Sequence, residues 1–205
     1  MGDTDVPFTM QSTSKPFSYA MALSEYGENY VHKHVGREPS GRFFNEISLD
    51  NDKKPHNPMI NAGAIMTVGI LYPELTIGDR FDKICSAFKK AAGGKHLSFN
   101  NSVFLSEREN ADRNFALAYF MRENGVYPEE VAKDKFKESL ELYFMICSME
   151  VTVESGAILA STLANGGVCP LTGERVFKAD MVKHVLSLML SCGMYKAFEN
   201  ENKKF

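Results

Sequence analysis

The sequence lacks the features that mark membrane-spanning, disulfide-stapled, metal-binding and repetitive proteins. Its 205 residues contain no internal repeat, and no apolar run approaches the roughly 20 residues that span a bilayer. The four cysteines form no C-x-x-C pair, and the five histidines form no H-E-x-x-H cluster. His32 and His34 are near neighbours, but a surface pair explains them more simply. We therefore expect free, buried thiols in a reducing compartment and no metal site.

The sequence also lacks a large excess of charge of one sign, and it lacks a recognisable targeting segment. The formal net charge is only -3, which indicates neither a nucleic-acid partner nor an anionic membrane surface. The first residues show neither a signal-peptide nor a transit-peptide pattern. A hydrophobic fraction of 44% and a charged fraction of 24% are ordinary for a globular chain, and the length fits one domain.

Strand-like alternation is scarce, whereas helical periodicity fills most segments between the glycines and prolines. Residues 36–57 are polar and rich in Gly, Pro, Asn and Asp, which predicts a long loop. We expect a turn with little sheet at 169–177 and a frayed tail at 196–205. The chain is predicted to be mainly α, with helices over about 12–25, 28–35, 58–71, 76–92, 112–123, 131–148, 153–164 and 179–191.

Several helix ends carry recognisable signals. Asn57-Pro58 predicts a helix start, because Asn caps and Pro suits the first helical position. The helix that follows is apolar almost all round, which predicts burial in the core. Ser106 and Glu109 have the spacing of a capping box, and Asp112 and Thr152 are expected to cap the helices that follow them.

The sharpest local signal is the S-x-x-K pattern of Ser12 and Lys15, at a predicted helix start that Pro16 also favours. Positions i and i+3 share a helix face, so the lysine amine can reach the serine hydroxyl. A lysine acts as base only when its pKa falls by about three units from about 10.4, which burial can cause. The pattern alone is common, and polar helix-start residues are its simplest explanation.

Several longer motifs occur along the chain in the same order as in a known protein family. The chain resembles the glutaminase family, closest to its animal kidney- and liver-type branch, over about residues 2–195. The matching segments are Gly2-Asp3-Thr4, Gln11-Ser12-x-x-Lys15-Pro16, Glu38-Pro39-Ser40-Gly41, Lys54-Pro55-His56-Asn57-Pro58-Met59-Ile60-Asn61-Ala62-Gly63-Ala64, Ser106-Glu107-Arg108-Glu109, Asp112-Arg113-Asn114-Phe115-Ala116, Tyr143-Phe144, Cys147-Ser148, Leu163-Ala164-Asn165-Gly166-Gly167, Pro170-x-Thr172-Gly173-Glu174-Arg175 and Ser191-Cys192-Gly193-Met194-Tyr195.

The resemblance implies hydrolysis of L-glutamine to L-glutamate and ammonia through a serine acyl-enzyme. By the same resemblance Ser12 is the nucleophile, Lys15 its base, and Tyr195 a proton-shuttling tyrosine. The groups implied to hold the amino-acid end of the substrate, beside Ser12 and Tyr195, are Asn61, Glu107, Asn114 and Tyr143. A carboxylate suits an α-ammonium, and amides can donate to an α-carboxylate.

Taken as residues alone, each of these side chains also fits an ordinary structural role. Asn61 could bond only to backbone, and Glu107 could be a first-turn helix charge. Asn114 could be an exposed helix residue, and Tyr143 and Tyr195 could be ordinary packing.

The resemblance also implies the setting of the reaction. It implies no metal or organic cofactor, with phosphate as a candidate activator near the loop at 37–54. It implies self-association to dimers or tetramers through the helix at 112–123, and a mitochondrial location, with the cytoplasm as the alternative. Core packing is the competing role for Phe115, Tyr119 and Phe120 on that helix.

The family pattern continues beyond the matched stretch on both sides. We expect residues 1–195 to be part of a glutaminase catalytic domain and 196–205 to be a divergent tail. The fold implied is the helical portion of a serine β-lactamase-like or penicillin-binding-protein-like α/β domain, whose strands lie largely in the flanks. The alternative function is a catalytically impaired piece that acts by co-assembly with full-length subunits. A β-lactam-binding enzyme is disfavoured because S-D-N and K-T-G are absent.

Overall fold

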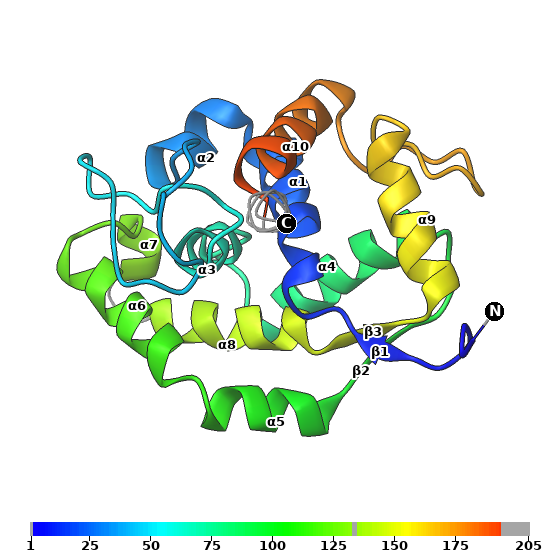
Figure 1. Cartoon of the computed structure of the whole chain (residues 1–205), viewed down its shortest axis with the longest axis horizontal. Helices are drawn as coiled ribbons and strands as arrows, with labels where there is room; N and C mark the ends of the chain where they lie inside the picture. Colours follow the sequence, from blue (N-terminus) through cyan, green and yellow to red (C-terminus); the bar gives the residue numbers. More distant parts are fainter. Residues whose placement is uncertain (1, 133–134, 194–205) are drawn as a thin grey trace, which may run out of the picture.

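A buried apolar helix, α3 (Asn61–Gly69), lies at the centre of the molecule (Figure 1). All of its residues are buried, as its uniformly apolar sequence predicts. The computed structural model describes residues 2–132 and 135–193. Tyr195 and the tail at 196–205 lie outside the described residues.

Arg80, which lies on the next helix, caps the carboxyl end of α3. Its side chain is fully buried, and Nε donates to Leu71 O at 2.9 Å. Its Nη2 donates to Val68 O and Gly69 O, both at 3.0 Å. Unpaired carbonyls give a helix end partial negative charge. The guanidinium therefore supplies hydrogen bonds to carbonyls at the end of α3, and the partial negative charge of that end compensates its positive charge.

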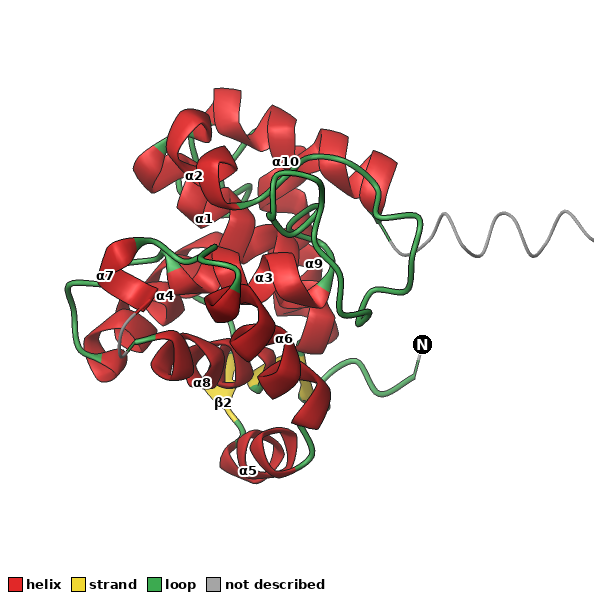
Figure 2. Ribbon diagram, turned by 90° about the vertical axis from the view of Figure 1, so that its left-hand side faces the viewer, coloured by secondary structure: helices red, strands yellow, loops and turns green. Residues whose placement is uncertain are grey.

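The other helices wrap around α3. Helices α1 (Lys15–Tyr26) and α8 (Phe136–Cys147) pack directly on it, and α6 (Asp112–Glu123) joins from a third side. Helices α4 (Ile77–Ala91), α9 (Val153–Ala164) and α10 (Ala179–Cys192) build outward from this core, with α10 against α1 (Figures 1 and 2). The shorter elements are η1 (Gln11–Ser14), α2 (Glu28–His34), α5 (Asn101–Glu109) and α7 (Glu129–Ala132).

A small antiparallel sheet joins the segments that precede η1, α5 and α9. Its order is β1 (Phe8–Thr9), β3 (Met149–Val151) and β2 (Leu97–Phe99), with Val151 opposite both Phe8 and Leu97. Two- and three-residue strands are too short to show a period-2 pattern, so sequence analysis missed them. The turn predicted at 169–177 carries a single bridge, Val168 to Arg175. The mainly α prediction is confirmed.

Helix boundaries were predicted with mixed success. Thr152 caps α9 and shares a capping box with Ser155, and Thr76 caps α4. The capping box at Ser106 and Glu109 is wrong, because both residues lie inside α5, whose cap is Asn100.

Three further boundaries differ from prediction. Asp112 is the first residue of α6 rather than its cap. Asn57 Oδ1 accepts from the backbone of Met59 and Ile60, so it caps the turn at 58–60 that directly precedes α3. The helix predicted over 131–148 is divided into α7 and α8.

The predicted loop at 36–57 folds back on itself and on α3. Gly36 N donates to Pro55 O at 2.7 Å, and Glu38 N donates to His56 O at 3.0 Å. Asn61 N donates to Phe44 O at 2.8 Å, which ties the middle of the loop to the start of α3. The loop thereby lies beside the amino end of the central helix.

Cys147 and Cys169 are buried free thiols, Cys85 is a half-buried one, and Cys192 is also half-buried. Among the residues that the structure describes, no helix is both long and apolar enough to cross a bilayer.

Candidate active site

Ser12 lies on η1, a tight turn fixed from both sides. Thr13 Oγ1 donates to Met10 O at 2.6 Å, and Ser14 Oγ donates to Gln11 O at 2.7 Å. Met10 N donates to Met149 O at 2.8 Å, which anchors the turn to β3. Gln11 has a φ of 48°, an uncommon conformation for a side chain other than glycine. The strained backbone holds the half-exposed Ser12 at the entrance of α1.

Lys15 follows one turn later and is buried, with 3% of its side chain exposed. Its Nζ donates to Asn61 Oδ1 at 2.7 Å, and the Phe44 ring lies 5.7 Å from Nζ. Burial lowers the pKa of Lys15 from 10.5 to about 8. About one lysine in ten is therefore neutral at pH 7. This agrees with the requirement inferred from the sequence, that the amine must be desolvated to serve as a base.

Asn61 continues the chain of polar contacts. Its Nδ2 donates to Asn114 Oδ1 at 3.0 Å, so Lys15 on α1, Asn61 on α3 and Asn114 on α6 form one hydrogen-bonded series. The interpretation of Asn61 as a residue that bonds only to backbone is wrong. Asn114 is half-buried and is not a free surface residue. Helix packing brings together three residues that are 46 and 53 positions apart.

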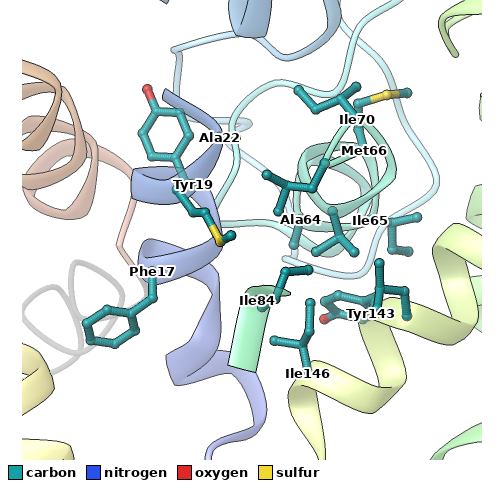
Figure 3. Packing of buried hydrophobic residues seen from close by; sticks show 14 of the residues in the cluster. Phe17, Tyr19, Ala22, Ala64, Ile65, Met66, Ile70, Ile84, Tyr143 and Ile146 are labelled. Atoms are coloured by element: carbon teal, nitrogen blue, oxygen red, sulfur yellow. The ribbon is translucent and has the colours of Figure 1, made fainter. Parts of the chain in front are cut away.

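Tyr143 and Glu107 lie on the α8 side of the same cluster. Tyr143 is 5% exposed and reaches from α8 into the space between α3 and α1 (Figure 3). Burial raises the pKa of Tyr143 well above its usual value, with Cys147 and Glu107 acting in the same direction. Glu107 is half-buried in the last turn of α5, so its interpretation as a first-turn helix charge is wrong. Its neighbour Arg108 pairs with Glu141 at 3.1 Å.

The structure joins three of the seven predicted residues, Lys15, Asn61 and Asn114, by hydrogen bonds. Within the described residues, no hydrogen bond joins Ser12 Oγ to Lys15 Nζ, whose partner is Asn61 instead. Tyr195 lies outside the described residues, so its predicted place at the serine stays a prediction. Cys147 lies one helical turn after Tyr143 and is buried, as the sequence predicts for a free thiol.

The arrangement suits a small polar substrate with groups of opposite charge. The buried amine of Lys15, one turn after Ser12, is linked to the amides of Asn61 and Asn114, and the half-buried Glu107 carboxylate acts on the charge of Tyr143. In residues 2–132 and 135–193, no cluster of three His, Cys, Asp or Glu side chains has metal-binding geometry.

Comparisons with known proteins agree on one family. The glutaminase family model matches residues 1–200. Putative glutaminase 2 of Caenorhabditis elegans is 52% identical over 196 residues, covering 96% of this chain and 32% of that protein. The mitochondrial liver isoform of glutaminase from Rattus norvegicus is 46% identical over 195 residues, covering 95% and 32%.

A solved structure shows the same fold. The crystal structure of Mglu in its L-glutamate binding form has a TM-score of 0.85 and 40% identity to this chain. The match covers 95% of this chain and 43% of that one. The chain thus spans about a third of the length of the two relatives above, at 32% of each. From the family match, the identities and the shared fold, the chain belongs to the glutaminase family.

Proposed function

We propose that this chain hydrolyses L-glutamine to L-glutamate and ammonia through an ester formed on Ser12. One observation carries the proposal: Lys15, three residues after Ser12, is buried with a pKa of about 8 and is held by Asn61. An amine of this kind is a base available near neutral pH. Membership of the glutaminase family supports the choice of substrate.

The proposed chemistry has two steps. Neutral Lys15 accepts the Ser12 hydroxyl proton as Oγ attacks the side-chain carboxamide carbon of glutamine. The tetrahedral intermediate collapses, the C–N bond breaks, and the proton passes to the leaving nitrogen, which departs as ammonia. Water then attacks the ester carbon, Lys15 accepts a proton from that water, and the C–O bond to Ser12 breaks. Ser12 regains its proton, and glutamate leaves.

The remaining predicted residues are proposed to hold the amino-acid end. Glu107 would pair with the α-ammonium, while the amides of Asn61 and Asn114 would donate to the α-carboxylate. Tyr143 would contact the same end, and Tyr195 would shuttle protons at Ser12. The hydrogen bonds among Lys15, Asn61 and Asn114 support this grouping, because they place binding groups beside the proposed base.

The setting of the reaction is proposed with the same reasoning. We propose no metal or organic cofactor, with phosphate as a candidate activator at the loop of residues 37–54. A mitochondrial location is supported by the name of the rat liver isoform, with the cytoplasm as the alternative.

Self-association to dimers or tetramers through α6 is also proposed. Tyr119 is 45% exposed, although its ring also packs on Phe136 with centroids 5.2 Å apart, and its exposed part is the proposed contact on that helix. Phe115 instead packs on Phe144 with ring centroids 6.0 Å apart, which agrees with the core-packing interpretation of Phe115.

The first test is release of ammonia from L-glutamine by the purified chain, with and without phosphate. Ser12→Ala is expected to lower the rate to background, since the proposed ester cannot form without the hydroxyl. Ser106→Ala, at an exposed serine on α5, is the matched control and should keep the wild-type rate.

Two results would contradict the proposal. Ammonia release that survives Ser12→Ala would remove the serine from the reaction. A folded wild-type chain that releases no ammonia would favour the impaired piece that acts by co-assembly.

A further inference from the structure

His32 is a half-buried side chain in the last turn of α2 that the proposed reaction does not use. Its Nδ1 lies 2.8 Å from Val35 O, and its Nε2 lies 2.9 Å from the hydroxyl oxygen of Tyr19 on α1. The Tyr19 and His32 rings also pack edge to face, with centroids 5.8 Å apart. Both nitrogens of this imidazole therefore have a partner on a neighbouring segment.

These partners fix which nitrogen of His32 carries the proton. Burial lowers the pKa of His32 and raises the pKa of Tyr19, so the imidazole is neutral at pH 7 and the phenol keeps its proton. A carbonyl oxygen can only accept, so Nδ1 donates to Val35 O. Nε2 then accepts from the Tyr19 hydroxyl, which holds the ring in this orientation.

The carbonyl that His32 binds belongs to the peptide group at the base of the loop at 36–57. On the other side of this peptide, Gly36 N donates to Pro55 O at 2.7 Å. The carbonyl and N–H of a trans peptide point in opposite directions, so one planar group is held from both sides. A Cβ added at Gly36 would lie 2.6 Å from His56 O, so the returning segment packs directly against this peptide.

The middle of the same loop lies on the groups assigned to the reaction. Asn61 N donates to Phe44 O at 2.8 Å, and the Phe44 ring lies 5.7 Å from Lys15 Nζ. We propose that His32 is a positioning residue, whose Nδ1–H fixes the base of the loop and thereby the contact of Phe44 with Asn61. The proposal rests on the proposed function, because that function assigns Asn61 to the substrate.

Amide hydrogen exchange in the free chain, followed residue by residue by NMR, tests the proposal. His32→Gln removes the donor to Val35 O, because the glutamine amide replaces Nε2 and not Nδ1. Loss of one neutral hydrogen bond predicts that exchange becomes about five- to tenfold faster at the amides of Gly36 and Asn61, which are bonded through the loop. The amide of Ala64, which is bonded within the first turn of α3, should exchange at the wild-type rate.

A second variant separates the hydrogen bond from packing of the ring. His32→Asn places an amide donor near the position of Nδ1 and loses the partner of Tyr19, so both loop amides should exchange within about twofold of the wild-type rates. In calorimetric titration, L-glutamate should bind more weakly to His32→Gln than to wild type by a similar five- to tenfold factor, and His32→Asn should restore the affinity. His96→Gln, at an exposed histidine before β2, is the matched control and should behave as wild type in both measurements.

Four results would overturn the proposal. They are wild-type exchange at Gly36 and Asn61 in His32→Gln, equal acceleration at Ala64, no rescue by His32→Asn, and unchanged glutamate affinity in His32→Gln. Because exchange is measured without substrate, a folded wild-type chain that binds no glutamate would contradict the proposed function alone. The loop amides would still decide whether His32 holds the loop in that case.

Discussion

At the scale of single residues, Lys15 shows what the local sequence predicts and what it omits. The spacing from Ser12 to Lys15 identifies a candidate nucleophile and base, because one helical turn separates them. Its observed partner, Asn61, lies 46 positions away and is set by the packing of α1 on α3. Local pattern carries no information on such a contact. The burial that lowers the pKa of the amine is likewise a property of the assembled core.

Burying this amine costs stability in a pH-dependent way. Its pKa is 10.5 when it is exposed to water and about 8 in the fold, so between these values the unfolded chain binds more protons. The cost is present in full below pH 8 and is relieved as the pH rises toward 10.5. We therefore expect the free energy of unfolding of wild type, relative to Lys15→Met, to rise by about 3 kcal/mol between pH 7 and pH 10.5.

Urea unfolding at a series of pH values measures this difference. Taking the difference between the two proteins cancels the titration of other groups. Lys178→Met, at an exposed lysine, is the control and has no buried charge to relieve. If the difference in free energy of unfolding between wild type and Lys15→Met does not change with pH, the amine is not desolvated. The proposal that Lys15 acts as a base would then lose its physical basis.

At the scale of elements, α3 combines a predicted feature with one that sequence alone could not reveal. Its uniformly apolar residues predicted a buried helix. The role of Gly63 depends instead on how closely the loop that precedes α3 approaches this helix. A Cβ added there would lie 1.8 Å from Asn57 O, a backbone atom that is fixed by its turn. The glycine permits the loop to pass directly over the helix that carries Asn61.

Gly63→Ala is accordingly expected to destabilise the fold strongly. A methyl group forced against backbone has no flexible side chain to displace, which predicts a loss of about 3 kcal/mol. The control is Gly78→Ala in α4, where the nearest atom is 3.9 Å away. There the change should be neutral or stabilising by up to about 1 kcal/mol, since alanine favours helix.

Thermal unfolding of the two alanine variants gives the comparison. Equal melting temperatures for both would show that the loop can move away from α3. In that case the hydrogen bond from Asn61 N to Phe44 O would not fix the loop at the site.

At the scale of the whole molecule, sequence reasoning predicted the class of fold and missed its smallest parts. Long amphipathic and apolar segments identified the helices, and ordered motifs identified the family, because both signals extend over many residues. The strands β1, β2 and β3 stayed hidden, because two or three residues carry too little pattern. Tertiary contacts such as Arg80 with the end of α3 have no local signature either.

The outer face of α10 has consequences for how whole molecules behave together. Leu186, Met189 and Leu190 share one face of the helix and are 40%, 40% and 80% exposed. A contiguous exposed apolar stripe promotes association in solution. We expect Leu190→Lys to raise the concentration at which the chain begins to associate, as measured by light scattering. Its stability should stay within about 0.5 kcal/mol of wild type, as is usual for surface substitutions.

Leu105→Lys is the matched control for the α10 stripe. Leu105 is 50% exposed on α5, and the substitution adds the same charge at a different face. If the stripe drives association, only Leu190→Lys raises the onset concentration, whereas a general effect of added charge would raise it in both variants. An equal shift in the two proteins would therefore contradict the α10 prediction and assign association to net charge instead.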